Sequence, residues 1–232
     1  MYKDQKLINT RIIHYPKLTE RKTYLESVCK NIIWSSKTSK DNITEEIIDL
    51  YYTEDPNLWN ERTQNLYKEA IPYRKMKEGD LSCSINHIEA WEDFYQNDNN
   101  TLGLFFEDDI ILCENFYSML DNMLEVSPAF DAMFIGGGFP HTVAPTLSSE
   151  KIGGFEFILK DHPATNCLCS YVLTKQTAKN MVDYLKNSKT VLPIDFEVNY
   201  MFKKFNTKVL HIMPMLCVEG SAVGMYKSVQ SR

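Results

Sequence analysis

The sequence lacks the features that would place the chain in or across a membrane. No uninterrupted run approaches the roughly 18 apolar residues of a membrane-spanning helix. The opening residues, MYKDQKLINT, contain no apolar segment of the kind found in a secretory signal. We therefore expect a cytoplasmic protein without a transmembrane segment, and we leave a peripheral membrane contact open.

Cysteine and glycine patterns exclude two further classes of site. The six cysteines form no CxxC pair, so the sequence indicates neither a zinc site nor a disulfide framework, and we expect buried free thiols. The glycine run at 136–138 lacks the third glycine of the GxGxxG dinucleotide fingerprint. A nicotinamide or flavin dinucleotide is therefore not indicated.

Composition and charge narrow the class of partner. Hydrophobic residues make up 44% of the chain and charged residues 24%, which is typical of a globular protein. A net charge of −6 argues against nonspecific binding to nucleic acid or to an anionic membrane. A length of 232 residues suits one large α/β domain, so we predict a single domain over residues 1–232.

One acidic stretch stands out. The apolar run 102–106 leads directly into Glu107, Asp108 and Asp109, and a second apolar run, 110–112, follows. A buried, unpaired carboxylate costs several kcal/mol, so this triplet calls for a cation or for strong hydrogen-bond donors. Strand alternation predicts Glu107 and Asp109 on one face and Asp108 on the other. Oxygen donors of this kind suit Mg²⁺ or Mn²⁺; the alternative is a solvated turn.

Strands and helices alternate along the chain. The patterns predict strands over 9–15, 102–106, 132–135, 155–159, 168–173 and 208–213, and helices from residue 18, over 82–97, 115–125 and 174–185, and from residue 193. Residues 141–154 read as a mobile loop, and 35–60 receive no role. This order predicts an α/β sheet with helices on both faces, and it places the carboxylates at a strand's C-terminal end, where such sheets bind ligands.

Several other residues are candidates, each with a structural alternative. Arg21, early in the first helix, could reach a phosphate or only face solvent. His87 shares a helix face with Trp91 and could be a packing residue. Gly136 and Gly137 could form the floor of a substrate site or a plain turn.

Asp195 and Glu197 lie in the first turn of the helix that Pro193 opens. Each could act as a general base. The helix macrodipole favours acidic residues at this position, so a purely structural role accounts for either of them equally well.

Taken in order, these motifs resemble glycosyltransferase family 25, the lipopolysaccharide-biosynthesis and collagen-galactosyltransferase type. The resemblance rests on Gly79, Cys83, His87 and Trp91, then on 104–109, and then on SYVLTKQTAKNMVDYL, LPIDFEV and VEGSAVGMYKSV. It covers most of the chain after about residue 79. The sequence departs from the family's pattern in three places. Asn86 stands where the family has serine, HYPKLTERK matches the family's opening segment only loosely, and VEG replaces a glutamine-containing end. These differences concern the sugar and the acceptor more than the reaction.

The resemblance implies a GT-A-like single domain with a Rossmann-like, mixed but mainly parallel sheet. It implies a donor-binding part at about 1–138 and an acceptor-side part at about 139–232. The reaction it implies is an inverting transfer of a hexose from a nucleotide-sugar to a glycan or other hydroxyl acceptor. The expected donor is UDP-linked, with galactose or glucose as the hexose.

The resemblance also implies roles for single residues. Asp109 would hold Mn²⁺ or Mg²⁺ with Glu107 or Asp108 assisting, and Asp108 would also face substrate. Asp195 is the first candidate for the general base and Glu197 the second. Arg21 and Lys227 would meet phosphate oxygens, and His87 would orient the site.

Two other functions fit the same residues. A metal-dependent phosphohydrolase or nucleotidyltransferase could use the same carboxylates on a phosphate ester. A glycan- or nucleotide-binding module without catalysis would bind ligand without turnover. The sequence leaves the nucleotide, the sugar, the acceptor and the oligomeric state open.

Overall fold

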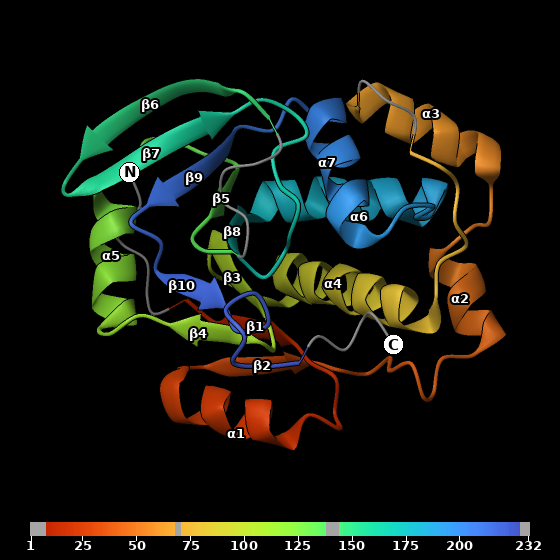
Figure 1. The fold of residues 1–232 in the computed structure, drawn as a ribbon, viewed down its shortest axis with the longest axis horizontal. Helices are drawn as coiled ribbons and strands as arrows, with labels where there is room; N and C mark the ends of the chain where they lie inside the picture. Colours follow the sequence, from red (N-terminus) through yellow and green to blue (C-terminus); the bar gives the residue numbers. More distant parts are fainter. Residues whose placement is uncertain (1–7, 68–70, 138–143, 228–232) are drawn as a thin grey trace.

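One eight-stranded sheet forms the centre of the molecule (Figure 1). The computed structural model describes residues 8–67, 71–137 and 144–227. The strand order is β2-β1-β3-β8-β5-β9-β7-β6. The strands span β1 Thr10–Ile13, β2 Ile32–Ser35, β3 Leu102–Glu107, β5 Ala132–Phe134, β6 Thr146–Ile152, β7 Phe155–Lys160, β8 Ser170–Thr174 and β9 Val209–Met213.

Most strands of this sheet run in the same direction. β1 pairs in parallel with both β2 and β3, and β5 pairs in parallel with β9. Strands β8 and β7 run opposite to the other six, because each pairs antiparallel with both of its neighbours. The predicted α/β fold with a mixed, mainly parallel sheet is confirmed.

Helices cover both faces of the sheet. On one face lie α1 Thr19–Val28 and α5 Phe116–Val126, whose Leu25 and Leu120 pack with Leu104 and Phe106 of β3. On the other lie α4 Glu78–Asn97, α6 Lys175–Ser188 and α7 Ile194–Lys204, which pack around Phe105. Figure 1 shows α5 and the α4–α6 pair on opposite sides of the central strands. The alternation of β3 side chains thus divides the core into two layers.

The acidic stretch leaves the sheet at Glu107. Asp108 and Asp109 form a turn, and the chain continues into β4 Ile110–Leu112, which pairs antiparallel with β10 Cys217–Glu219 outside the main sheet. The predicted two-face alternation over the triplet is therefore wrong beyond Glu107, because alternation holds only while the backbone stays extended.

Two expected boundaries also differ. The predicted loop 141–154 contains strand β6 from Thr146, which forms a hairpin with β7 around Gly153 and Gly154; residues 141–143 lie outside the described residues, as does Gly138. The strand was missed because its side chains are almost all exposed, so it shows no apolar alternation. Helix α4 begins at Glu78 and not at 82, because the Asp80 carboxylate accepts a hydrogen bond from the Lys77 N–H at 3.0 Å.

The stretch that carried no sequence assignment folds as two helices, α2 Glu45–Tyr51 and α3 Pro56–Leu66. Arg62 of α3 forms a buried ion pair with Glu197 of α7 and also donates to the Ser188 and Lys189 carbonyls at the end of α6. This contact fastens α3 to the helix layer. Within the described residues, no helix combines the length and the apolar character needed to cross a bilayer.

We expect Arg62→Met to lower the free energy of unfolding by about 3–5 kcal/mol, because it leaves the fully buried Glu197 carboxylate without its cation. Urea unfolding followed by circular dichroism measures the change. Lys179→Met, which removes an exposed pair with Asp183, is the control and should change little. Equal losses of unfolding free energy in the two variants would contradict the stabilising role of the buried ion pair.

Candidate active site

A pocket of about 250 Å³ opens at the C-terminal ends of β1 and β3. This is the edge at which parallel strands of an α/β sheet bind ligands. The residues that line it come from both ends of the chain: Ile13, His14, Tyr15, Leu18, Arg21, Lys40, Gly79, Ser82, Cys83, Asn86, Glu107, Asp108, Asp109, Asn166, Cys167, Asp195, Glu219 and Ser221. All three carboxylates of the acidic triplet face it.

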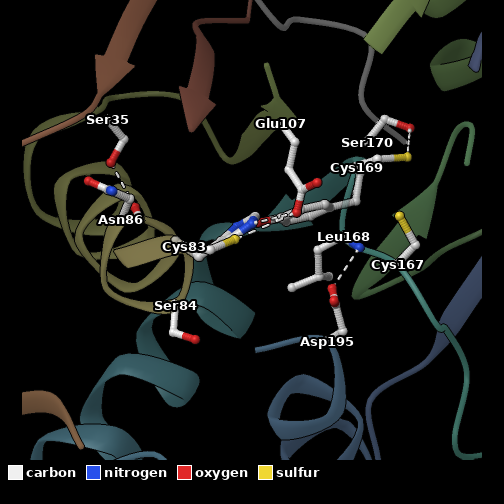
Figure 2. Close-up of polar contacts among 12 residues, drawn as sticks. Ser35, Cys83, Ser84, Asn86, Glu107, Cys167, Leu168, Cys169, Ser170 and Asp195 are labelled. Carbon is white, nitrogen blue, oxygen red and sulfur yellow. Dashed lines mark hydrogen bonds and ion pairs between the residues drawn. The ribbon is translucent and has the colours of Figure 1, made fainter. Parts of the chain in front are cut away.

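Glu107 meets helix α4 (Figure 2). Its Oε1 lies 3.3 Å from His87 Nε2 and 3.8 Å from Cys83 Sγ. Burial, reinforced by the charges of Asp109, Glu219 and Asp108, raises the pKa of Glu107 to about 8. Glu107 therefore holds a proton near neutral pH unless a cation enters the pocket.

A chain of hydrogen bonds sets the orientation of His87, which is fully buried behind the pocket wall. Trp91 Nε1–H donates to Tyr171 Oη at 2.9 Å, and Tyr171 Oη lies 2.8 Å from His87 Nδ1. Burial lowers the pKa of His87 to about 4, so the ring is neutral and carries one N–H. With the tyrosine hydroxyl donating to Nδ1, that N–H lies on Nε2 and donates to Glu107.

Asp108 is saturated by protein donors. Its Oδ2 accepts from the Tyr15 N–H at 2.9 Å and lies 2.9 Å from His14 Nδ1, and its Oδ1 accepts from Arg21 at 2.7 Å. These contacts tie the end of β1 and helix α1 to the acidic turn. Asp108 therefore organises the pocket wall and has little capacity left for a ligand.

Asp109 is placed differently. Its Oδ1 is buried and has no hydrogen-bond partner within the described residues. Burial raises the pKa of Asp109, the charge of Glu219 raises it further, and the nearby Ser221 hydroxyl opposes the shift. An unpaired carboxylate oxygen beside two other carboxylates is a poor arrangement in the absence of a cation.

Asp195 and Glu197 occupy opposite environments although only one residue separates them. Asp195 lines the pocket, and its Oδ1 accepts from the Leu168 N–H at 3.1 Å (Figure 2). Burial and the nearby Glu107 raise its pKa to about 7. Glu197 lies outside the pocket, where it pairs with Arg62 and accepts from the Thr190 hydroxyl and from two backbone N–H groups. The structure thus brings Asp195, and not Glu197, to the acidic triplet.

The predicted cationic residues and glycines also fall into two groups, those that line the pocket and those that do not. Arg21 lines the pocket between Asp108 and the Lys227 carbonyl, to which it donates at 2.7 Å. The Lys227 side chain is exposed and is not part of the lining. Gly136 and Gly137 do not line the pocket either. A Cβ on Gly136 would lie 2.2 Å from the Cys217 carbonyl oxygen, so this glycine permits the close approach of β10.

Several lining residues escaped the sequence prediction, among them His14, Cys167, Glu219 and Ser221. Glu219 raises the pKa of Glu107, Asp109 and Asp195, so it belongs to the same carboxylate group. Glu219 is the middle residue of the VEG stretch at 218–220. No local sequence pattern links it to β3, which lies more than 100 positions earlier in the chain. Only the β4–β10 pairing brings it there.

The donor chemistry of the pocket suits a hard divalent cation, although the oxygens of Asp109, Glu107 and Glu219 do not all lie within 4.8 Å of one another. All three residues line the pocket, and Asp109 Oδ1 is buried without a hydrogen-bond partner among the described residues. Oxygen-rich sets of this kind are the ones that Mn²⁺ and Mg²⁺ prefer.

We expect the metal-free protein to lose stability as pH rises. Glu107 and Asp195 ordinarily titrate at 4.5 and 3.8, but in the fold their pKa values are about 8 and 7. Between those values the folded chain keeps protons that the unfolded chain has released, so the free energy of unfolding falls with increasing pH. Urea unfolding in the presence of chelator at several pH values measures this slope.

Glu107→Gln should flatten the slope, whereas Glu114→Gln, at an exposed position, should leave it unchanged. A wild-type stability that rises from pH 5 to pH 8 would contradict the burial of these protonated acids.

Two solved structures share a distant likeness with the chain. Mouse Xyloside xylosyltransferase 1 in its apo form aligns with 87% of this chain and 70% of its own, at 8% identity and a TM-score of 0.41. The UTP-bound UGPase from Acinetobacter baumannii aligns with 94% of this chain and 91% of its own, at 11% identity and a TM-score of 0.42. Likenesses this distant carry no inference about ligand or reaction.

Sequence comparisons are more informative. A protein of Haemophilus influenzae named "Putative glycosyltransferase" is 25% identical over 189 residues, which cover 78% of this chain and 62% of that protein. The chain thus spans less than two thirds of that relative's length. The sequence model of glycosyltransferase family 25, described as "LPS biosynthesis protein", matches residues 9–198. This match includes the acidic triplet, helix α4 and Asp195, and the chain therefore belongs to glycosyltransferase family 25.

Proposed function

We propose that the protein is a metal-dependent, inverting glycosyltransferase that moves a hexose from a nucleotide-sugar to a hydroxyl group of a glycan or similar acceptor. One observation carries the proposal: Glu107, Asp109, Glu219 and Asp195 converge on a single pocket in a chain of this family. A UDP-linked donor with galactose or glucose is our first choice, from the family resemblance alone.

The metal ligands in this proposal are Asp109, Glu107 and Glu219. When bound, Mn²⁺ or Mg²⁺ supplies positive charge that stabilises a diphosphate leaving group. His87 donates to Glu107 and holds this carboxylate toward the pocket. Asp108 contributes indirectly, because it fixes Arg21 and His14 at the pocket wall.

Asp195 acts as the general base. An inverting transfer needs a group that takes the proton of the acceptor hydroxyl, and a carboxylate with a pKa of about 7 is available as a base near neutral pH and accepts a proton readily. The Leu168 N–H fixes its orientation. Glu197, paired with Arg62 away from the pocket, has a structural role.

Phosphate groups of the donor would meet Arg21 and Lys40, the two cationic side chains among the lining residues. Lys227 contributes through its backbone carbonyl, which holds Arg21. The donor-binding part at about 1–138 then supplies the metal ligands Glu107 and Asp109, and the acceptor-side part at about 139–232 supplies Asp195 and the third ligand, Glu219.

We expect one nucleoside diphosphate to be released when a panel of UDP-, GDP-, ADP- and CMP-sugars is offered with Mn²⁺ and candidate acceptors. Chelator or Asp109→Ala should abolish this release, and Glu114→Gln, an exposed acid outside the pocket, should not. Release of phosphate or pyrophosphate would instead favour a phosphohydrolase or a nucleotidyltransferase. Binding of nucleotide without turnover would favour a binding module.

Asp195→Asn should lower kcat by roughly 10²–10⁴-fold, because the amide cannot accept the acceptor's proton. Donor binding, measured by calorimetry, should stay close to wild type, since the base acts on the acceptor. An unchanged kcat would remove Asp195 from the mechanism.

A further inference from the structure

A second group of metal-ligand atoms borders the same pocket. Cys167 Sγ, Cys169 Sγ and a carboxylate oxygen of Glu219 all lie within 4.8 Å of one another. Cys167 Sγ donates to Glu219 Oε2 at 3.4 Å. Figure 2 shows the two thiols on the opposite side of the view from Cys83.

Local structure explains why the two thiols meet. Cys167 and Cys169 are only two positions apart in the segment that leads into β8, so the chain itself keeps their thiols close, and the two Sγ atoms lie within 4.8 Å of each other. The Cys169 carbonyl accepts from the Glu107 N–H at 2.9 Å, which anchors the segment beside β3. Glu219 comes from β10 and is held by the Ser221 hydroxyl at 2.6 Å. Cys169 and Glu219 therefore sit on paired backbone, and the Cys167 N–H donates to the Thr165 hydroxyl at 3.1 Å.

The chemistry of these donors differs from that of the acidic triplet. Two thiolates with one carboxylate form a set that Zn²⁺ and similar borderline-soft cations bind, usually with tetrahedral geometry, whereas Mn²⁺ and Mg²⁺ prefer oxygen. Cys167 and Glu219 both line the pocket, so a cation has a route in and a fourth position open to solvent or ligand. Cys169 is buried, which shields its thiol.

We propose that Cys167, Cys169 and Glu219 bind Zn²⁺, or a cation of similar softness, at a site separate from the one for Mn²⁺ or Mg²⁺ but sharing Glu219 with it. Both thiols release their protons to solvent as the two metal–sulfur bonds form. The other candidate triad, Cys83, His87 and Glu107, has a single thiol, and both nitrogens of its histidine are already engaged.

Zinc bound at this site would inhibit the proposed transferase. This step rests on the proposed function. Zn²⁺ bound to Glu219 would withdraw a ligand from the catalytic metal and occupy part of the pocket wall. The transferase would then respond to zinc at a site that its own metal does not fill.

Co²⁺ is the probe, because it replaces Zn²⁺ and gives an absorption band when thiolates bind it. The full chain is titrated with Co²⁺ in the presence of a phosphine reductant, which keeps the thiols reduced. We expect a band that saturates at one equivalent and disappears when Zn²⁺ is added. Cys167→Ser and Cys169→Ala should weaken binding by at least the roughly 10–100-fold that loss of an outer-shell partner costs.

Cys83→Ser and Cys113→Ser are the matched controls, one inside the pocket and one outside it, and should keep the band. Circular dichroism confirms that each variant is folded; Cys167 is only half-buried, so its variant serves even where Cys169→Ala does not fold. No band in the wild type, a band that survives in Cys167→Ser, or a band lost in Cys83→Ser would each overturn the proposal.

A second readout tests the inhibition. In the donor assay with Mn²⁺, micromolar Zn²⁺ should inhibit the wild type and inhibit Cys167→Ser much less. Because the cobalt spectrum needs no turnover, a failure of the proposed transferase activity leaves the binding result intact, and the two failures can be told apart.

Discussion

Concentrated negative charge at the end of β3 is the constraint on which the rest of the structure depends. Three consecutive carboxylates, joined by Glu219 and Asp195, share one partly buried pocket. Burial, reinforced by the neighbouring like charges, raises the pKa of Glu107 and of Asp195.

The carboxylates differ because their neighbours differ. Asp108 takes three protein donors and becomes a structural tie between β1, α1 and the acidic turn. Asp109 keeps a buried oxygen without a partner within the described chain. A similar contrast separates Asp195, which faces the pocket, from Glu197, which Arg62 neutralises in the core. The paired carboxylates contribute to the stability of the fold, and the unpaired ones are available to bind a ligand.

The pocket also brings together two kinds of potential metal ligand. Oxygen donors gather at the acidic turn, and two thiols stand at the approach to β8, with Glu219 between them. Since cations select donors by softness and geometry, the pocket in our proposal would discriminate between Mn²⁺ and Zn²⁺. Glu219 serves both sites in that proposal, so the identity of the bound ion would determine whether the proposed transferase is competent.

The sequence by itself determined the α/β order, the buried strand before Glu107, the acidic triplet and the helical pairing of His87 with Trp91, because each depends on contacts within a few residues. It could not separate Asp195 from Glu197, find β6 among exposed side chains, or connect Glu219 and Cys167 with Asp109. Those depend on strand pairing and packing between distant segments: β10 on β4, α7 against α3, and the segment before β8 beside β3. Local patterns record which side chains favour a strand or a helix, but only the tertiary structure decides which charges end up as neighbours.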